Sequence, residues 1–152
     1  MRKVVISDTS CLIILDKIGE LDLLYKLYGT VFTTPQIAEE FGDELPFWVE
    51  IKEVFDKQKI KLLETNLDKG EASAIALAME YENSLLILDD HKARKLALQL
   101  ELIYTGTIGI IIAAKKKQII SSIKPIIEKI KQTNFHITVE LELQALKEAD
   151  EL

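Results

Sequence analysis

Acidic residues recur in this sequence at places that are typical of a site handling a cation. They are Asp8, Glu40, Glu71, Asp89 and Asp90. Carboxylates that are brought together repel one another, so either their pKa values rise or a cation neutralises them. No lysine or arginine lies within these short motifs, which favours the cation. Oxygen ligands suit Mg²⁺ or Mn²⁺, and such an ion can activate water for phosphodiester hydrolysis.

Short apolar runs alternate with helical patterns along the chain, and these elements must position the acids. Expected strands cover residues 3–7, 31–33, 60–63, 85–88 and 102–104. Expected helices cover residues 11–16, 21–28, 36–41, 47–57, 68–81, 91–100, 107–116, 125–131 and 139–149. This alternation predicts an α/β fold, a three-layer α/β/α sandwich with a central, mainly parallel sheet, in a single domain over residues 1–152. Phe47 and Trp48, within one expected helix, are expected in the core.

The elements place the acids at one end of the expected sheet. Asp8 directly follows the first strand, and Asp89 and Asp90 follow the strand over residues 85–88. Glu71 lies in the first turn of an alanine-rich helix, on its buried face. Because ligands bind beyond the carboxyl ends of parallel strands, we expect these groups to converge.

Each acid also has a purely structural interpretation. Asp8 and Asp90 can cap the helices that follow them, and Glu71 can form a capping box with Asp68. We favour a functional cluster of acids, because acids follow two strands and a further acid, Glu71, lies on a buried helical face. Two choices stay open: whether Asp89 or Asp90 is the fourth acid, and whether Glu39 or Glu40 is the second.

Length and composition limit the class of protein. The chain has 152 residues and a net charge of −6, which argues against nucleic-acid binding over its whole surface but leaves room for local basic patches. Apolar runs are too short for a membrane span or a signal-peptide core, so we expect no membrane association. A single cysteine, Cys11, points to a reducing cytoplasm.

Several motifs together resemble the PIN-domain family, and within it the VapC-like branch of toxin–antitoxin ribonucleases. The motifs are Asp8-Thr9-Ser10, Pro35 with Glu40-Phe41, Gly70-Glu71-Ala72, residues 86–90 and Thr105-Gly106-Thr107. The resemblance implies a Mg²⁺- or Mn²⁺-dependent endoribonuclease acting on RNA, a homodimer, and a small antitoxin protein that inserts near the acidic cleft. It assigns the four acidic positions to Asp8, Glu40, Glu71 and Asp90, with Asp89 as the alternate, and a hydroxyl position to Ser10.

Two other interpretations remain beside the enzyme. One is a PIN-like binding module that does not catalyse, which the sequence does not separate from the nuclease. The other is a receiver-like phosphoacceptor domain, which is disfavoured because its paired acids would come early and a lysine would follow a late strand. Arg94 and Lys95 are placed to meet a phosphate near the acids, although exposure to solvent on a helix surface explains them equally well.

Overall fold

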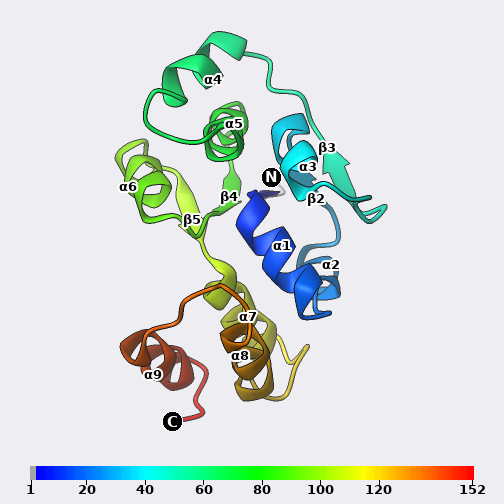
Figure 1. The fold of residues 1–152 in the computed structure, drawn as a ribbon, viewed down its shortest axis with the longest axis vertical. Helices are drawn as coiled ribbons and strands as arrows, with labels where there is room; N and C mark the ends of the chain where they lie inside the picture. Colours follow the sequence, from blue (N-terminus) through cyan, green and yellow to red (C-terminus); the bar gives the residue numbers. More distant parts are fainter. Residues whose placement is uncertain (1–2) are drawn as a thin grey trace.

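A parallel five-stranded sheet forms the centre of the computed structural model, which describes residues 3–152 (Figure 1). The strands are β1 (Val4–Ser7), β2 (Val31–Thr33), β3 (Val49–Ile51), β4 (Ser84–Ile87) and β5 (Ile103–Thr105), in the order β3-β2-β1-β4-β5. The helices are α1 (Thr9–Lys17), α2 (Asp22–Tyr28), α3 (Pro35–Phe41), α4 (Lys57–Leu63), α5 (Lys69–Ala78), α6 (His91–Gln99), α7 (Thr107–Lys116), α8 (Lys124–Lys131) and α9 (Val139–Glu148). The predicted α/β fold with a parallel sheet is confirmed.

Helices cover both faces of the sheet because its strands are apolar on both sides. Figure 1 shows α5 and α6 on one side, and α1, α2 and α7 on the other. Helix α5 packs against β1 and β4, and its alanines allow a close approach to the sheet. Ile6 in β1 and Leu86 in β4 are fully buried, and they pair in register at the middle of the sheet. No helix within residues 3–152 combines the length and the apolar character needed to cross a membrane.

One stretch of the chain differs from the sequence prediction. The helix expected over residues 47–57 is wrong, because β3 forms there and pairs with β2. The strand expected over residues 60–63 is also wrong, because these residues belong to α4, which Asp56 caps. Phe47, expected in the core, is 86% exposed, whereas Trp48 is buried as expected.

The C-terminal helices are tied to the rest of the molecule through Glu151. Its carboxylate accepts hydrogen bonds from Lys115 Nζ at 2.9 Å, Ser122 Oγ at 2.6 Å and the Ile123 backbone N–H at 2.8 Å. Burial opposes ionisation of this carboxyl, but these hydrogen bonds and the charge of Lys115 outweigh it and lower the pKa to about 2. Glu151, which is partly buried, thus ties α7 and the start of α8 to the segment that follows α9.

Candidate active site

Asp8 lies at the carboxyl end of the central strand and is almost completely buried. Its side chain is 3% exposed, and Oδ1 accepts a long hydrogen bond, 3.4 Å, from the Cys11 backbone N–H at the start of α1. Burial raises the pKa of Asp8 well above its usual value, and the charge of Asp89 raises it further. Among residues 3–152, no lysine, arginine or histidine forms an ion pair with Asp8. The predicted helix cap exists, yet it leaves this acid without a compensating positive charge.

Glu71 approaches the same region from the first turn of α5. The Asp68 side chain caps this helix by accepting from the Glu71 backbone N–H at 2.8 Å, so the Glu71 carboxylate is not needed for the cap. Burial raises the pKa of Glu71 to about 7, with further contributions from the charges of Asp68, Asp90 and Glu40. Glu71 therefore lies within the electrostatic reach of three other carboxylates.

Glu40 reaches the cluster from the last turn of α3. Its Oε1 accepts a hydrogen bond from the Thr9 hydroxyl. The carboxylate lies against Gly70, where a Cβ atom would stand 2.1 Å from Oε1. Glycine at this position therefore leaves room for the Glu40 carboxylate. Glu39 and Glu40 are both exposed.

Asp89 and Asp90 both face the cluster, but they have different partners. Asp89 accepts hydrogen bonds from the Thr107 backbone N–H at 2.8 Å and from Thr107 Oγ1 at 2.6 Å. Asp90 is more exposed and caps α6 by accepting from the Ala93 backbone N–H at 2.9 Å. The charge of Asp89 acts on Asp8 and that of Asp90 acts on Glu71, so the two neighbours serve different sides of the site.

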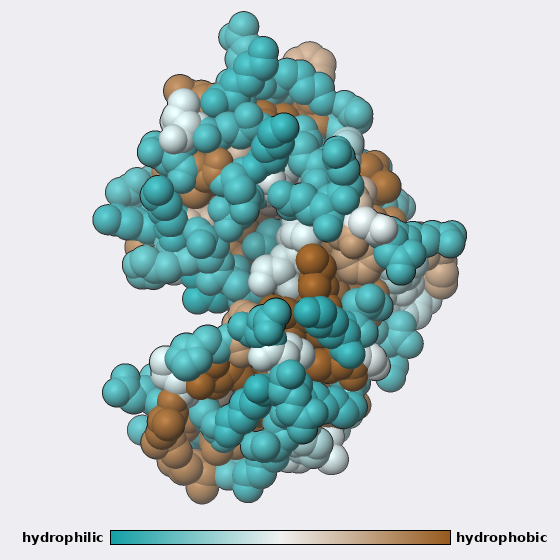
Figure 2. All heavy atoms as spheres, in the orientation of Figure 1, coloured by the Kyte–Doolittle hydropathy of each residue, from teal (hydrophilic) through white to brown (hydrophobic). Residues whose placement is uncertain are grey.

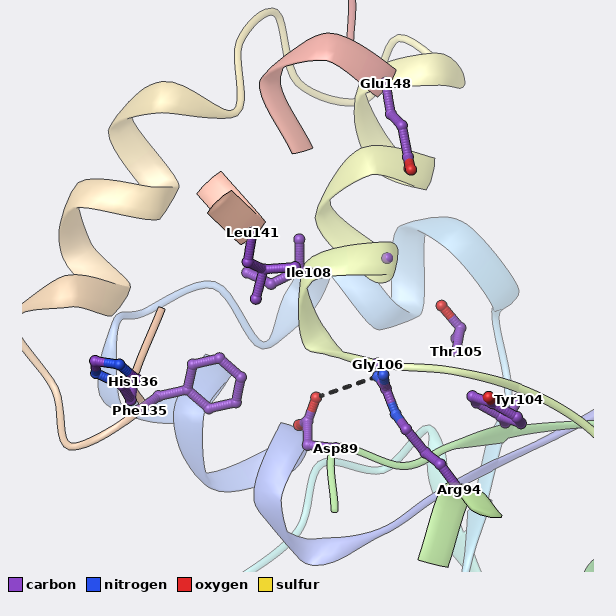
Figure 3. A pocket seen from close by; sticks show the side chains of 11 residues that line it. Asp89, Arg94, Tyr104, Thr105, Gly106, Ile108, Phe135, His136, Leu141 and Glu148 are labelled. Carbon is purple, nitrogen blue, oxygen red and sulfur yellow. Dashed lines mark ion pairs between the residues drawn. The ribbon is translucent and has the colours of Figure 1, made fainter. Parts of the chain in front are cut away.

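A cavity of about 400 Å³ opens between these elements. It is lined by Asp8, Thr9, Ser10, Ile13, Glu40, Asp68 and Glu71. Asp89 lines a neighbouring cavity instead, together with Arg94 and Gly106 (Figure 3). Ser10 contributes its surface to the first cavity, but within the described residues its hydroxyl does not bond Asp8.

The structure identifies two positioning threonines that the sequence interpretation did not assign. Thr9 holds Glu40, and Thr107 holds Asp89. Each contact joins residues that are far apart in the chain, so no local spacing points to it. The only available signal was the presence of both threonines in motifs that carry the family resemblance.

The donor set fits a divalent cation that retains part of its water shell. As they stand, no three histidine, cysteine, aspartate or glutamate side chains within residues 3–152 converge tightly enough to ligate one ion directly. Mg²⁺ commonly uses only one or two carboxylates and keeps several waters, and the cavity beside Asp8 has space for them. Burial and then the neighbouring carboxylates raise the pKa values of Asp8 and Glu71, and a bound cation would favour the ionised forms of both side chains.

Comparison with known proteins provides one match. The model of a PIN-domain family, DUF3368, matches residues 4–151. No curated protein matches the chain.

Proposed function

The chain belongs to the PIN-domain family, whose members are generally nucleases, and from this premise we propose that it is a metal-dependent endoribonuclease. The proposed reaction is hydrolysis of phosphodiester bonds in RNA with Mg²⁺ or Mn²⁺. The observation that carries the proposal is Asp8, a buried carboxyl without a cationic partner that faces the charges of Asp89 and Glu71. A purely structural acid would not need further acids around it.

The residues divide into those that would hold the metal and those that position them. Asp8, Glu40, Glu71, Asp89 and Asp90 would hold the ion directly or through its water. When bound, Mg²⁺ or Mn²⁺ would supply a lowered pKa for water and charge stabilisation at the scissile phosphate. Thr9 fixes the carboxylate of Glu40, and Thr107 fixes that of Asp89. Ser10 lies beside Asp8 on the cavity wall and would bond a water molecule there.

We also propose that the nuclease acts as the toxin of a type II toxin–antitoxin pair and that it forms a homodimer. The support is the resemblance of the motifs around Asp8, Glu71 and Asp90 to the VapC-like branch. The expected partner is a small antitoxin protein that covers the acidic cavity. Co-expression with the product of an adjacent short reading frame should abolish RNA cleavage, and cleavage that persists in a stable complex would contradict this role.

Cleavage of a labelled, mixed RNA pool tests the catalytic proposal. Wild-type protein is incubated with Mn²⁺, Mg²⁺ or EDTA, beside Asp8→Asn, Glu71→Gln and Glu40→Gln. Glu39→Gln is the matched control because it changes the net charge equally and Glu39 does not line the acidic cavity. We expect metal-dependent cleavage that the first three substitutions reduce at least about 100-fold, since several ligands would act as one unit. Equal background cleavage by all the proteins, with metal still bound, would favour a binding module.

A further inference from the structure

A second cavity, of about 430 Å³, is lined by Asp89 but not by Glu71. It lies between the β5 edge of the sheet and α9, and Figure 2 shows the surface hollowed between α6 and α9. Figure 3 shows Asp89 and Arg94 on one side and the Phe135 and His136 side chains across from them. We name it the Arg94 cavity. Its volume is in the range of small-molecule sites and accommodates a nucleotide.

Arg94 is a fixed cation next to an otherwise acidic site. Its Nε donates to the Leu88 carbonyl oxygen at 2.6 Å, and its guanidinium lies 5.4 Å from the centre of the Tyr104 ring. Nη2 stands 4.0 Å from Asp89 Oδ1, too far for a hydrogen bond. Among the described residues only the Nε atom of Arg94 has a hydrogen-bond partner. The N–H groups of Nη1 and Nη2 can therefore donate hydrogen bonds to an anion.

Gly106 leaves the space that the Arg94 guanidinium occupies. A Cβ atom at this position would stand 1.9 Å from Arg94 Nη2 and 2.8 Å from Asp89 Oδ1. Only glycine leaves room for both groups at this end of β5. Gly106 therefore allows the Arg94 guanidinium to lie beside Asp89, one of the proposed metal-holding acids.

We propose that the Arg94 cavity binds the nucleotide adjoining the scissile bond of single-stranded RNA. Arg94 contacts its phosphate, because a guanidinium binds phosphate through two parallel hydrogen bonds. Phe135, half-buried on the opposite wall, stacks on the base, as aromatic side chains do with unpaired RNA. This inference rests on the proposed nuclease function and adds where the substrate lies.

Binding and cleavage measured separately test this inference. Fluorescein-labelled single-stranded RNA is titrated in EDTA with wild type, Arg94→Ala, Arg94→Lys and Phe135→Leu. Lys92→Ala is the matched control, since it removes the same charge from the exposed side of α6. We expect Arg94→Ala and Phe135→Leu each to weaken binding about tenfold. Arg94→Lys should restore part of it, and Lys92→Ala should change it less than twofold.

The outcomes separate this inference from the proposed function. With metal present, Arg94→Ala should raise KM more than it lowers kcat. If wild type cleaves RNA but Arg94→Ala and Phe135→Leu behave like Lys92→Ala in both assays, the Arg94 cavity is not a subsite. If wild type never cleaves but binding still depends on Arg94 and Phe135, the cavity inference stands and the nuclease proposal fails.

Discussion

At the scale of single residues, the acidic site depends on small groups that leave room for carboxylates or hold them. Gly70 admits Glu40, and Gly106 admits both Arg94 and Asp89. The hydroxyls of Thr9 and Thr107 orient two of the acids. None of these groups carries charge, so their loss should reduce activity by displacing the acids that do.

Gly70→Ala tests this dependence on space. The new methyl group would meet Glu40 Oε1 and push the carboxylate away from Thr9, while alanine favours a helix by up to about 1 kcal/mol over glycine. We expect cleavage to fall about tenfold with an unchanged or higher Tm. Lys69→Ala, an exposed neighbour on α5, should leave both quantities unchanged. A fall in Tm that parallels the loss of cleavage would point to misfolding instead.

The raised pKa of Glu71 predicts how pH and metal act together on stability. A carboxyl whose pKa is higher in the folded chain keeps more protons when folded, so its contribution to the unfolding free energy falls as pH rises. For Glu71 this window runs from 4.5 to about 7. Without metal we therefore expect Tm to decrease by a few degrees across this window, since about 1 kcal/mol corresponds to about 2–4 °C.

Thermal melts at pH 5 and pH 8, with Mn²⁺ or EDTA, measure this effect. Protons and the cation compete for the same carboxylates, so Mn²⁺ should raise Tm more at pH 8 than at pH 5. Glu71→Gln should make the Tm measured in EDTA less dependent on pH. An equal Mn²⁺ effect at both pH values would contradict metal binding by these acids.

At the scale of elements, the sequence predicts most of the framework, and the errors have a physical cause. Helix α7 begins and ends at the residues expected, and strand β2 covers the residues expected. The predictions for residues 47–57 and 60–63 are wrong because short apolar runs fit either periodicity. Pairing with β2 selects a strand at Val49–Ile51. The hydrogen bond from Thr107 to Asp89 is not predictable from local spacing either, because the two residues come together only when β4 and β5 pair.

Glu151 offers an element-scale prediction, because it joins α7, the start of α8 and the end of the chain. Glu151→Gln removes a charge-assisted contact and should lower the unfolding free energy by about 2 kcal/mol at pH 7. A carboxyl with a lowered pKa stabilises the fold above its unfolded pKa of 4.5, and this contribution disappears as pH falls toward about 2.

Urea unfolding between pH 2 and pH 7 measures this contribution. Below pH 4.5 the wild type should lose stability more steeply than Glu151→Gln, so the two curves should converge in acid. Asp150→Asn is the control, since Asp150 is exposed and has a positive φ of 58° that asparagine tolerates. Parallel curves for wild type and Glu151→Gln would show that this carboxyl does not tie the helices.

At the scale of the whole molecule, stability and chemistry reside in different regions and can be separated. Leu24 is fully buried in α2, and the residues that line the acidic cavity come from α1, α3 and the chain around α5. Leu24→Ala should lower the unfolding free energy by about 3 kcal/mol. Calorimetry should show the lower Tm, while cleavage per folded molecule at low temperature stays at the wild-type level. A proportional loss of both would link α2 to the site.

The pairing of β1 with β4 joins residues about eighty positions apart, and Asp89 finds its partner only at Thr107. During synthesis Asp8 is the first of these acids to be made, but β4, one of the two strands beside β1, is complete only at Ile87, after more than half of the chain. Long-range pairing of this kind forms late in folding. A partly synthesised chain, or one released before β5, therefore lacks the assembled acidic cluster, so the proposed nuclease site forms only once most of the chain has been made.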